Sequence, residues 1–330
     1  MEERKPILDI QKLVVNYKVF GGYSYVINGL DLQVYPGEKI ALVGESGCGK
    51  TTTVKSIMKV LPRQGRIAGG KIIFDGQDVF SLNNNELNKM RGQKLSMIFQ
   101  DPTASLNPVF TIGKQIKDTI IYSGIEAKNN KEAIHKRAVQ ALIDCSMPDP
   151  ERILQSYPFQ LSGGMRQRIC IAMALATASK LMIADEPTTN LDVTIQDQVL
   201  RLIRQLAEEK HMSLILITHS MGVAKMMADR ICIMYAGNIV ETAPAEELLA
   251  NPHHPYTIGL MESIPKLTGD SQMKGIEGRV PSYQNPPSGC RYADRCPYAG
   301  EKCRKAFPPM FEAESGHMVA CYRYEKEGEA

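Results

Sequence analysis

The 330-residue sequence predicts an α/β fold with an antiparallel β subdomain at the N-terminus, a helical insert and a small cysteine-rich extension. Three observations predict it. Short apolar runs, each followed by polar residues, are typical of buried parallel strands. Residues 7 to 35 alternate apolar and polar side chains, which indicates antiparallel strands with one covered face. From residue 102 to about 175 the apolar residues recur at helical spacing.

The first buried strand is predicted at residues 40–43, Ile-Ala-Leu-Val. It leads directly into a glycine-rich loop and then into apolar positions with helical spacing, the context in which a phosphate loop is credible. Two further runs, at residues 181–184 and 214–217, have the length and branched side chains of buried parallel strands. We expect the functional side chains at the carboxyl ends of these strands.

Residues 44–51, Gly-Glu-Ser-Gly-Cys-Gly-Lys-Thr, fit the phosphate-loop pattern at every defined position. The glycines let the backbone curl, so that N–H groups and the following helix N-terminus point at a β-phosphate. Lys50 would neutralise the β- and γ-phosphates, and the Thr51 hydroxyl would coordinate Mg²⁺. The expected core is therefore a P-loop NTPase of the RecA-like kind. Its expected nucleotide-binding residues on this loop and helix are Gly44, Ser46, Gly47, Cys48, Gly49, Lys50, Thr51 and Thr52.

Two acidic residues follow the run at 181–184. Asp185 can hold Mg²⁺ directly or through water. Glu186, one residue further on, can accept a hydrogen bond from an attacking water. We therefore predict that Glu186 is the general base of nucleotide hydrolysis.

Residues 161–168, Leu-Ser-Gly-Gly-Met-Arg-Gln-Arg, indicate a second anion-binding feature. Ser162 is a good helix N-cap, and Gly163 and Gly164 leave the first amides of the helix open to an anion.

In this order, these motifs resemble the ATPase subunits of ABC transporters over roughly residues 7 to 250. The resemblance implies that two subunits close face to face around ATP, with residues 162–164 of one contacting the γ-phosphate held by the other. It also implies that Gln100 contacts Mg²⁺ and water and that His219 contacts the γ-phosphate. Asp192 matches the loop that couples the two sites.

The same resemblance places an aromatic ring on adenine, upstream of the phosphate loop. Tyr17 is the predicted platform. The segment at 20–25, Phe-Gly-Gly-Tyr-Ser-Tyr, offers competing rings, and a tyrosine on an alternating strand can also serve packing alone.

Near residue 250 prolines become frequent, which predicts little regular structure beyond it. Residues 251–257, Asn-Pro-His-His-Pro-Tyr-Thr, and the cysteines that follow resemble the C-terminal extension of the oligopeptide and dipeptide importer subfamily. We expect an ATPase domain at 1–250, with its insert at about 102–175, and an extension at 251–330. The resemblance implies peptide import, with nickel-type substrates as a relative.

Four of the eight cysteines lie in this tail, where apolar residues are too few to fold the segment firmly. A bound metal would act as a staple. Zinc usually takes a short Cys-x₂₋₄-Cys hook, which is missing, whereas looser spacing and a proline after one cysteine suit a [4Fe–4S] cluster. Two alternatives remain: a zinc site, with His317 as an alternate ligand, or four thiols without a metal. The expected cluster ligands are Cys290, Cys296, Cys303 and Cys321.

The formal net charge of +3 does not favour binding to nucleic acid. No apolar run approaches the roughly 20 residues that cross a bilayer. We therefore expect a peripheral protein at the cytoplasmic face of the membrane. Its expected partners are a second ATPase subunit, identical or different, two transmembrane permeases and, indirectly, an extracytoplasmic peptide-binding protein. The alternatives are an importer of nickel or another small solute, and a soluble ABC ATPase in DNA repair or translation.

Overall fold

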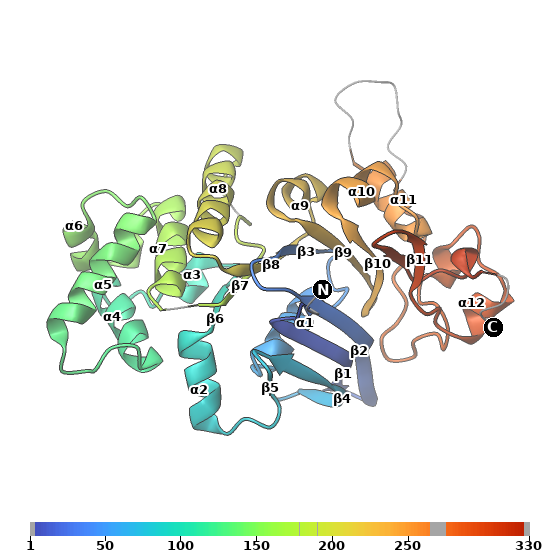
Figure 1. The fold of residues 1–330 in the computed structure, drawn as a ribbon, viewed down its shortest axis with the longest axis horizontal. Coiled ribbons are helices and arrows are strands. Elements are labelled where there is room, and N and C mark those ends of the chain that lie inside the picture. Colours follow the sequence, from blue (N-terminus) through green and yellow to red (C-terminus); the bar gives the residue numbers. More distant parts are fainter. Residues whose placement is uncertain (1–3, 178, 190, 265–274, 327–330) are drawn as a thin grey trace. The chain divides into compact units, whose positions relative to one another are not determined.

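The computed structural model describes residues 4–177, 179–189, 191–264 and 275–326. The chain divides into two compact units, and Figure 1 labels their elements. Unit 1 comprises Met1–Ile7, Val34–Lys39 and Gln77–Ile217, and unit 2 comprises Leu8–Gln33, Ile40–Gly76 and Thr218–Ala330. The expected division at residue 250 stays a prediction.

The N-terminal strands of unit 2 form the expected antiparallel subdomain. Strands β2 (Gly22–Val34), β1 (Leu8–Val19) and β4 (Gly65–Phe74) lie in this order, and β1 pairs antiparallel with β4. Alternate residues of β1 are buried, beginning with Leu8 and Ile10, because one face of the sheet is covered. Apolar and polar residues alternate in this part of the sequence because one face of the sheet is buried and the other is not.

A bulge interrupts the pairing of β1 with β4. The register shifts between Gln11 and Val14, and Lys12 has a left-handed backbone with φ 48°. On the opposite strand Gly70 has φ +84°, and a Cβ built there would lie 2.4 Å from the Lys12 carbonyl oxygen and 2.5 Å from that of Gln11. Only glycine fits between these backbone atoms.

The remaining strands of unit 2 carry the phosphate loop and the tail. They lie in the order β3, β9, β10, β12, β11, with β3 parallel to β9 and the other neighbours antiparallel. Their bounds are β3 (Lys39–Val43), β9 (Arg230–Tyr235), β10 (Asn238–Pro244), β11 (Phe311–Glu314) and β12 (His317–Val319). The tail is thus less irregular than predicted, because β12 adds to the edge of β10.

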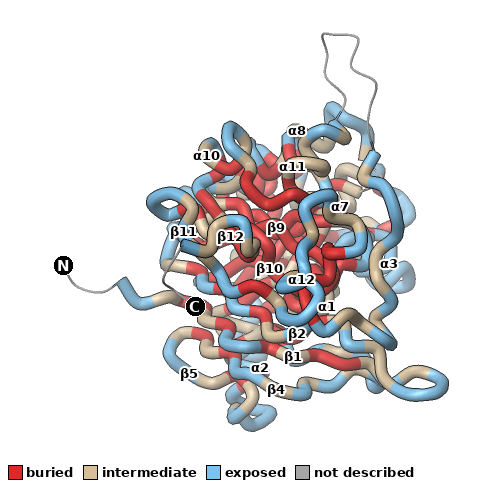
Figure 2. Tube along the Cα trace, turned by 90° about the vertical axis from the view of Figure 1, so that its right-hand side faces the viewer, coloured by how far each residue is buried: buried red, intermediate tan, exposed pale blue. Residues whose placement is uncertain are grey.

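The helices of unit 2 are short. They are α1 (Lys50–Ile57), α9 (Met221–Met227), α10 (Ala245–Ala250), α11 (Pro255–Glu262) and α12 (Glu301–Lys305), with 3₁₀ turns η2 (Ala293–Arg295) and η3 (Tyr322–Tyr324). Figure 2 shows β9 and β10 buried within the fold. One hydrophobic cluster joins β9 to the tail: Tyr235 packs against Tyr256 and Tyr292 with ring centroids 4.6 and 5.1 Å apart. The tail therefore shares the core of unit 2.

Unit 1 contains three parallel strands and the helical insert. The strands lie in the order β8 (Ser213–Thr218), β7 (Leu181–Asp185), β6 (Leu95–Ile98), and β7 and β8 are entirely buried, as their apolar runs predicted. The helices are α2 (Asn84–Gln93), α3 (Pro102–Ser105), α4 (Ile112–Ser123), α5 (Lys131–Asp144), α6 (Pro150–Gln155), α7 (Gly163–Leu175) and α8 (Val193–Glu209). The strand β5 (Gln77–Asp78) and the 3₁₀ turn η1 (Pro158–Gln160) complete the unit.

Side-chain caps explain where these helices start. An Asn, Asp, Ser or Thr before each first turn accepts a hydrogen bond from a backbone N–H inside it. These N-caps are Asn83, Asp101, Thr111, Asn130, Asp149, Ser162 and Asp192. Within the described ranges, no helix has the length and apolar character needed to span a membrane.

The bulge gives a stability prediction with a matched control. Gly70 and Gly76 both have positive φ, 84° and 79°, so alanine at either position carries a similar backbone strain of about 1 kcal/mol. Only at Gly70 does the new methyl group meet backbone atoms, and overpacking of this kind costs about 1–3 kcal/mol more. We expect Gly70→Ala to lower the melting temperature more than Gly76→Ala. Equal shifts in a thermal melt would contradict this account of the bulge.

Candidate functional site

The phosphate loop of unit 2 joins β3 to α1, as the sequence predicted. Its first glycine packs against the end of β9, since a Cβ at Gly44 would lie 2.1 Å from the Met234 carbonyl oxygen. Gly49 has φ +111°, and a Cβ there would lie 2.7 Å from Ile27 Cδ1. Gly49 precedes α1 and has no side chain to cap it, so no capping side chain competes with an anion at the start of this helix.

The side chains of Lys50 and Cys48 pack inside the loop. Lys50 is 5% exposed, and its ammonium donates to the carbonyl oxygens of Gly44 at 2.7 Å and Glu45 at 3.0 Å. Cys48 Sγ lies 3.7 Å from Lys50 Nζ. Burial raises the pKa of the Cys48 thiol, although Lys50 opposes the rise, so this thiol is neutral and fills space.

Side chains from distant parts of unit 2 also hold the loop. The backbone N–H of Glu45 donates to Tyr256 Oη at 3.0 Å, and the Glu45 carboxylate accepts two hydrogen bonds from Arg295, at 3.1 and 3.3 Å. The Tyr283 hydroxyl donates to the Gly47 carbonyl oxygen at 2.9 Å. Sequence reasoning missed all three residues, because they lie more than 200 positions from the loop and the phosphate-loop pattern leaves residue 45 undefined.

Tyr17 lies beside the same helix. Its hydroxyl is 3.2 Å from Thr52 Oγ1, and its ring packs against Gly65. Of the competing rings, Phe20 is fully exposed and Tyr23 lies under the Arg66 guanidinium, 4.9 Å from it. The structure therefore places Tyr17 next to a predicted nucleotide-binding residue.

The acidic pair of unit 1 lies at the end of β7. Asp185 is buried, and Glu186 has a left-handed backbone with φ 45°, which costs about 1–3 kcal/mol for a non-glycine residue. Glu186 Oε2 accepts hydrogen bonds from Gln100 Nε2 at 3.1 Å and from Thr189 Oγ1 at 3.2 Å. The predicted base and the predicted Mg²⁺-contacting glutamine are thus in direct contact, across 86 positions of sequence.

The glycine-rich octapeptide of unit 1 starts a helix, as predicted. Ser162 caps α7, its Oγ accepting from the Met165 N–H at 3.3 Å, and both Ser162 and Gly163 are exposed. A Cβ at Gly164 would lie 2.8 Å from Ile195 Cγ2, so close packing against α8 requires glycine there. Exposed amides at the start of a 13-residue helix suit an anion from outside.

The family resemblance also implies roles for Asp192 and His219, and the structure describes both residues. Asp192 is the exposed N-cap of α8 and accepts from the Ile195 N–H at 3.0 Å. His219 in unit 2 follows the last residue of β8 and is exposed. Ser220, the next residue, caps α9.

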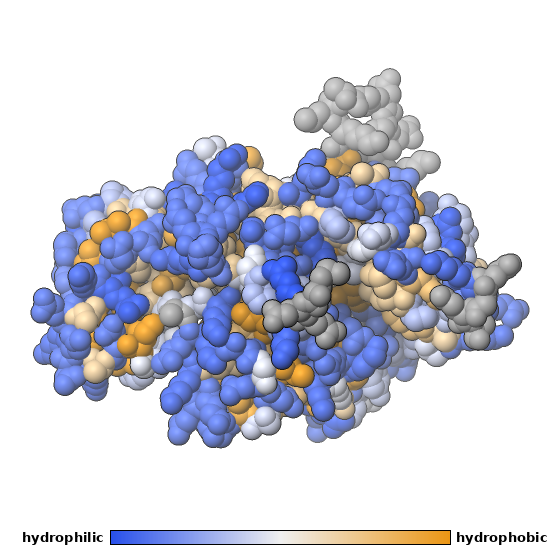
Figure 3. Space-filling model, in the orientation of Figure 1, coloured by the Kyte–Doolittle hydropathy of each residue, from blue (hydrophilic) through white to orange (hydrophobic). Residues whose placement is uncertain are grey.

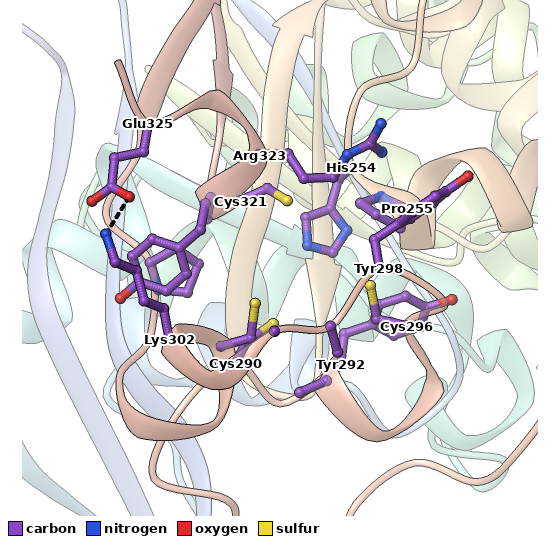
Figure 4. Close-up of a pocket in the computed structure, with 17 residues that line it drawn as sticks. His254, Pro255, Cys290, Tyr292, Cys296, Tyr298, Lys302, Cys321, Arg323 and Glu325 are labelled. Carbon is purple, nitrogen blue, oxygen red and sulfur yellow. Dashed lines mark hydrogen bonds and ion pairs between the residues drawn. The ribbon is translucent and has the colours of Figure 1, made fainter. Parts of the chain in front are cut away.

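The four tail cysteines line one cavity of about 280 Å³ in unit 2. Figure 4 shows the sulfur atoms of Cys290, Cys296 and Cys321 directed into it, together with the His254 ring. Burial raises the pKa of Cys290 to about 12, and the other three thiols add to the rise. Among the residues that the structure describes, no group of three or more His, Cys, Asp or Glu side chains is arranged to hold a metal ion.

A buried carboxylate anchors the tail beside this cavity. Glu241 on β10 is fully buried and accepts hydrogen bonds from the backbone N–H groups of His253 at 2.7 Å and His254 at 3.0 Å. His317 Nε2 lies 2.7 Å from Glu241 Oε1. His317, expected above as an alternate zinc ligand, is thus engaged with Glu241 instead of with the four thiols.

The comparisons with known proteins agree with this arrangement. Residues 27–189 match the family described as "ABC transporter", and residues 240–303 match the "Oligopeptide/dipeptide transporter, C-terminal region". The oligopeptide transport ATP-binding protein OppD of Bacillus subtilis is 44% identical over 95% of this chain and 87% of its own length. Its relative AppD, from the same organism, is 46% identical over 92% of each chain.

The chain belongs to the ATP-binding subunits of the oligopeptide and dipeptide ABC transporters. A dimeric structure of the ATP-binding cassette MJ0796, in a post-hydrolysis state bound to ADP and Pi, matches 72% of this chain and 98% of its own, with a TM-score of 0.64 and 27% identity. The predicted family, cassette fold and ATPase activity are confirmed, and ATP and Mg²⁺ are the expected cofactors of such an ATPase. The roles of single residues stay predictions.

His254 gives a pH prediction for unit 2. Its Nδ1 accepts from the Tyr256 N–H, and burial lowers its pKa from the ordinary 6.5 to about 3. Below pH 6.5 the unfolded chain therefore binds a proton that the folded chain rejects, so stability is lost as the pH falls, by up to about 1.4 kcal/mol per pH unit.

His254→Asn keeps an N-cap acceptor but cannot titrate. We expect it to flatten the fall in melting temperature between about pH 6.5 and 4.5. The exposed His211 is the control, since His211→Asn should keep the wild-type slope. An unchanged slope in His254→Asn would contradict the assignment.

Proposed function

We propose that this chain is the ATP-hydrolysing subunit that drives the import of dipeptides or oligopeptides through a membrane ABC transporter. The observation that carries the proposal is the continuous similarity over 95% of the chain to an oligopeptide transport ATP-binding protein, tail included. A small-solute importer of the same group is the second candidate. A soluble ATPase of DNA repair or translation fits less well, because the tail match belongs to transporters.

In this proposal each predicted site residue keeps the role that the family resemblance implies. Lys50 and the loop amides bind the phosphates, and Thr51 and Asp185 provide oxygen ligands for Mg²⁺, which when bound neutralises developing phosphate charge. Glu186 accepts the proton of the attacking water. The hydrogen bond from Gln100 supports this role, because it restricts the rotation of the Glu186 carboxylate.

A complete site further requires a second ATPase subunit. Ser162 and Gly163 are exposed at the start of α7, where backbone amides are suited to contact the γ-phosphate held by the partner, and Asp192 would couple the two sites. His219 would contact the γ-phosphate from the end of β8, and Tyr17 would stack on adenine. Either an identical or a different chain can supply the second half.

The proposed permease contacts lie on the helical insert of unit 1. Large apolar side chains are exposed there and next to Gln100, which suits a partner surface. Figure 3 shows apolar surface over α4 to α6, at the left of the view. Tyr157 and Phe159 stack in the turn that leads to α7, with ring centroids 5.6 Å apart. The exposed residues are Phe99, Val109, Phe110, Tyr157 and Phe159.

Binding to permeases would hold the chain at the cytoplasmic face of the membrane. An extracytoplasmic peptide-binding protein would be an indirect partner.

The general base is tested with Glu186→Gln, which removes the proton acceptor but keeps the shape of the side chain. We expect the affinity for ATP to stay near that of the wild type and hydrolysis to fall by at least about 100-fold. Phosphate release and equilibrium ATP binding measure the two effects. Glu132→Gln, an exposed acid on α5, is the control and should hydrolyse ATP normally. Unchanged hydrolysis in Glu186→Gln would remove Glu186 from this role.

Peptide import is tested by capturing the tagged chain from solubilised membranes and reconstituting the recovered complex in vesicles. We expect two membrane-spanning subunits to be recovered and ATP-dependent uptake of a labelled tripeptide. Glu186→Gln should abolish that uptake. Uptake of nickel instead of peptide would favour the second candidate, and recovery of ribosomes or DNA would favour a soluble ATPase.

We also propose that Cys290, Cys296, Cys303 and Cys321 bind a [4Fe–4S] cluster. The cavity lined by all four thiols supports it. Around one zinc ion the sulfurs crowd at about 2.3 Å from the metal, whereas in a cluster the four thiolates bind separate irons and stand further apart. The choice of a cluster over zinc rests on the loose spacing of the four cysteines in the sequence.

Anaerobic purification with assays for iron, acid-labile sulfide and zinc tests the cluster. We expect about four irons and four sulfides per chain, lost in Cys303→Ser but kept in Cys170→Ala, whose cysteine lies on α7. Zinc without iron would overturn the cluster, and the absence of both metals would leave a tail of free thiols.

A further inference from the structure

The contact between the phosphate loop and the tail joins two oppositely charged side chains. Arg295, at the end of η2, places Nη1 3.1 Å from Glu45 Oε2 and Nη2 3.3 Å from Glu45 Oε1. The Arg295 side chain is only 6% exposed and that of Glu45 is 27% exposed. A paired, two-point contact of this kind, largely removed from water, fixes both orientation and charge.

The guanidinium of Arg295 is oriented independently of Glu45. Nη1 also donates to Tyr235 Oη at 3.2 Å, Nη2 to the Ile276 carbonyl oxygen at 3.1 Å, and Nε to that of Glu277 at 2.9 Å. Burial acts to lower the pKa of Arg295, but the hydrogen bonds to Glu45 and Tyr235 raise it overall. Arg295 thus presents a permanent positive charge at a fixed place.

Glu45 needs such a partner because of where it lies. It is the second residue of a loop whose amides are suited to bind anionic phosphates, and nothing in the phosphate-loop pattern requires an acid there. Without a counter-charge, a partly buried carboxylate in this loop would repel a triphosphate. Arg295 cancels that charge and turns the carboxylate toward the tail.

A second tail residue fixes the loop backbone. Tyr283 donates its hydroxyl hydrogen to the Gly47 carbonyl oxygen at 2.9 Å, and its own carbonyl oxygen accepts from the Tyr25 N–H at 2.7 Å. Gly47 has φ +79°, a conformation that glycine adopts without strain. A carbonyl held from the tail side cannot rotate toward a phosphate oxygen, which it would repel.

We propose that Arg295 is a positioning residue for nucleotide binding, which neutralises Glu45 and, together with Tyr283, holds the phosphate loop in its binding conformation. The proposal rests on the proposed binding of ATP by residues 44–51. It assigns the tail a direct part in ATP affinity.

The test measures ATP affinity and melting temperature for the full-length chain. We expect Arg295→Gln to weaken ATP binding about tenfold, as loss of one charge-assisted contact does, and Arg295→Lys, which keeps the charge, to weaken it less. In the double variant Arg295→Gln/Glu45→Gln the repelling charge is gone, so the affinity should return to within about threefold of the wild type. Arg304→Gln is the control, because Arg304 makes an exposed ion pair with Asp294 in the same tail.

Wild-type affinity in Arg295→Gln would overturn the proposal. The proposal would also be overturned if the double variant bound ATP as weakly as Arg295→Gln alone. A merely structural role of Arg295 predicts that result. If Arg295→Gln does not fold, Tyr283→Phe, which removes one hydroxyl group, should still bind ATP about threefold more weakly, and an unchanged affinity would count against the proposal. Lys50→Ala tests the separate assumption that residues 44–51 bind ATP. Undiminished ATP binding in that variant would refute the ATP site itself.

Discussion

The close approach of backbone to backbone at the phosphate loop is the constraint on which the rest of unit 2 depends. Gly44 lies so near the Met234 carbonyl oxygen that no side chain could fit, and the Gly237 N–H donates to the Cys48 carbonyl oxygen at 2.8 Å. The loop is therefore shaped by the turn between β9 and β10 as well as by its own glycines. Any element that fixes this turn also acts on the loop.

The tail is one such element. Arg291 donates to the Ala236 carbonyl oxygen at 2.6 Å, next to Gly237, and Tyr292 packs on Tyr235 in the shared core. The extension that the sequence marks as separate is physically continuous with the nucleotide-binding part of unit 2. This continuity explains how a segment with few apolar residues keeps a defined structure.

The parts of the site that depend on local pattern could be predicted from the sequence. The spacing of apolar residues and glycines predicts the strand, loop and helix around Lys50. The capping preference of serine predicts that a helix starts at Ser162. The contact between Gln100 and Glu186 joins two strand ends, so the chain order does not reveal it, and the family resemblance was needed. Arg295 could not be found, because its partner Glu45 occupies an undefined position of the motif. The pairing of β12 with β10 was missed because three residues carry no periodicity.

The position of Glu241 has a consequence for how this chain can be divided. Its carboxylate lies on β10, before the expected boundary, while its partners His253, His254 and His317 lie after it. A chain cut near residue 250 would keep the acid but lose these three hydrogen-bond partners and the β12 strand that pairs with β10. The extension is therefore an integral half of a buried polar network, and we expect a chain shortened there to be less stable.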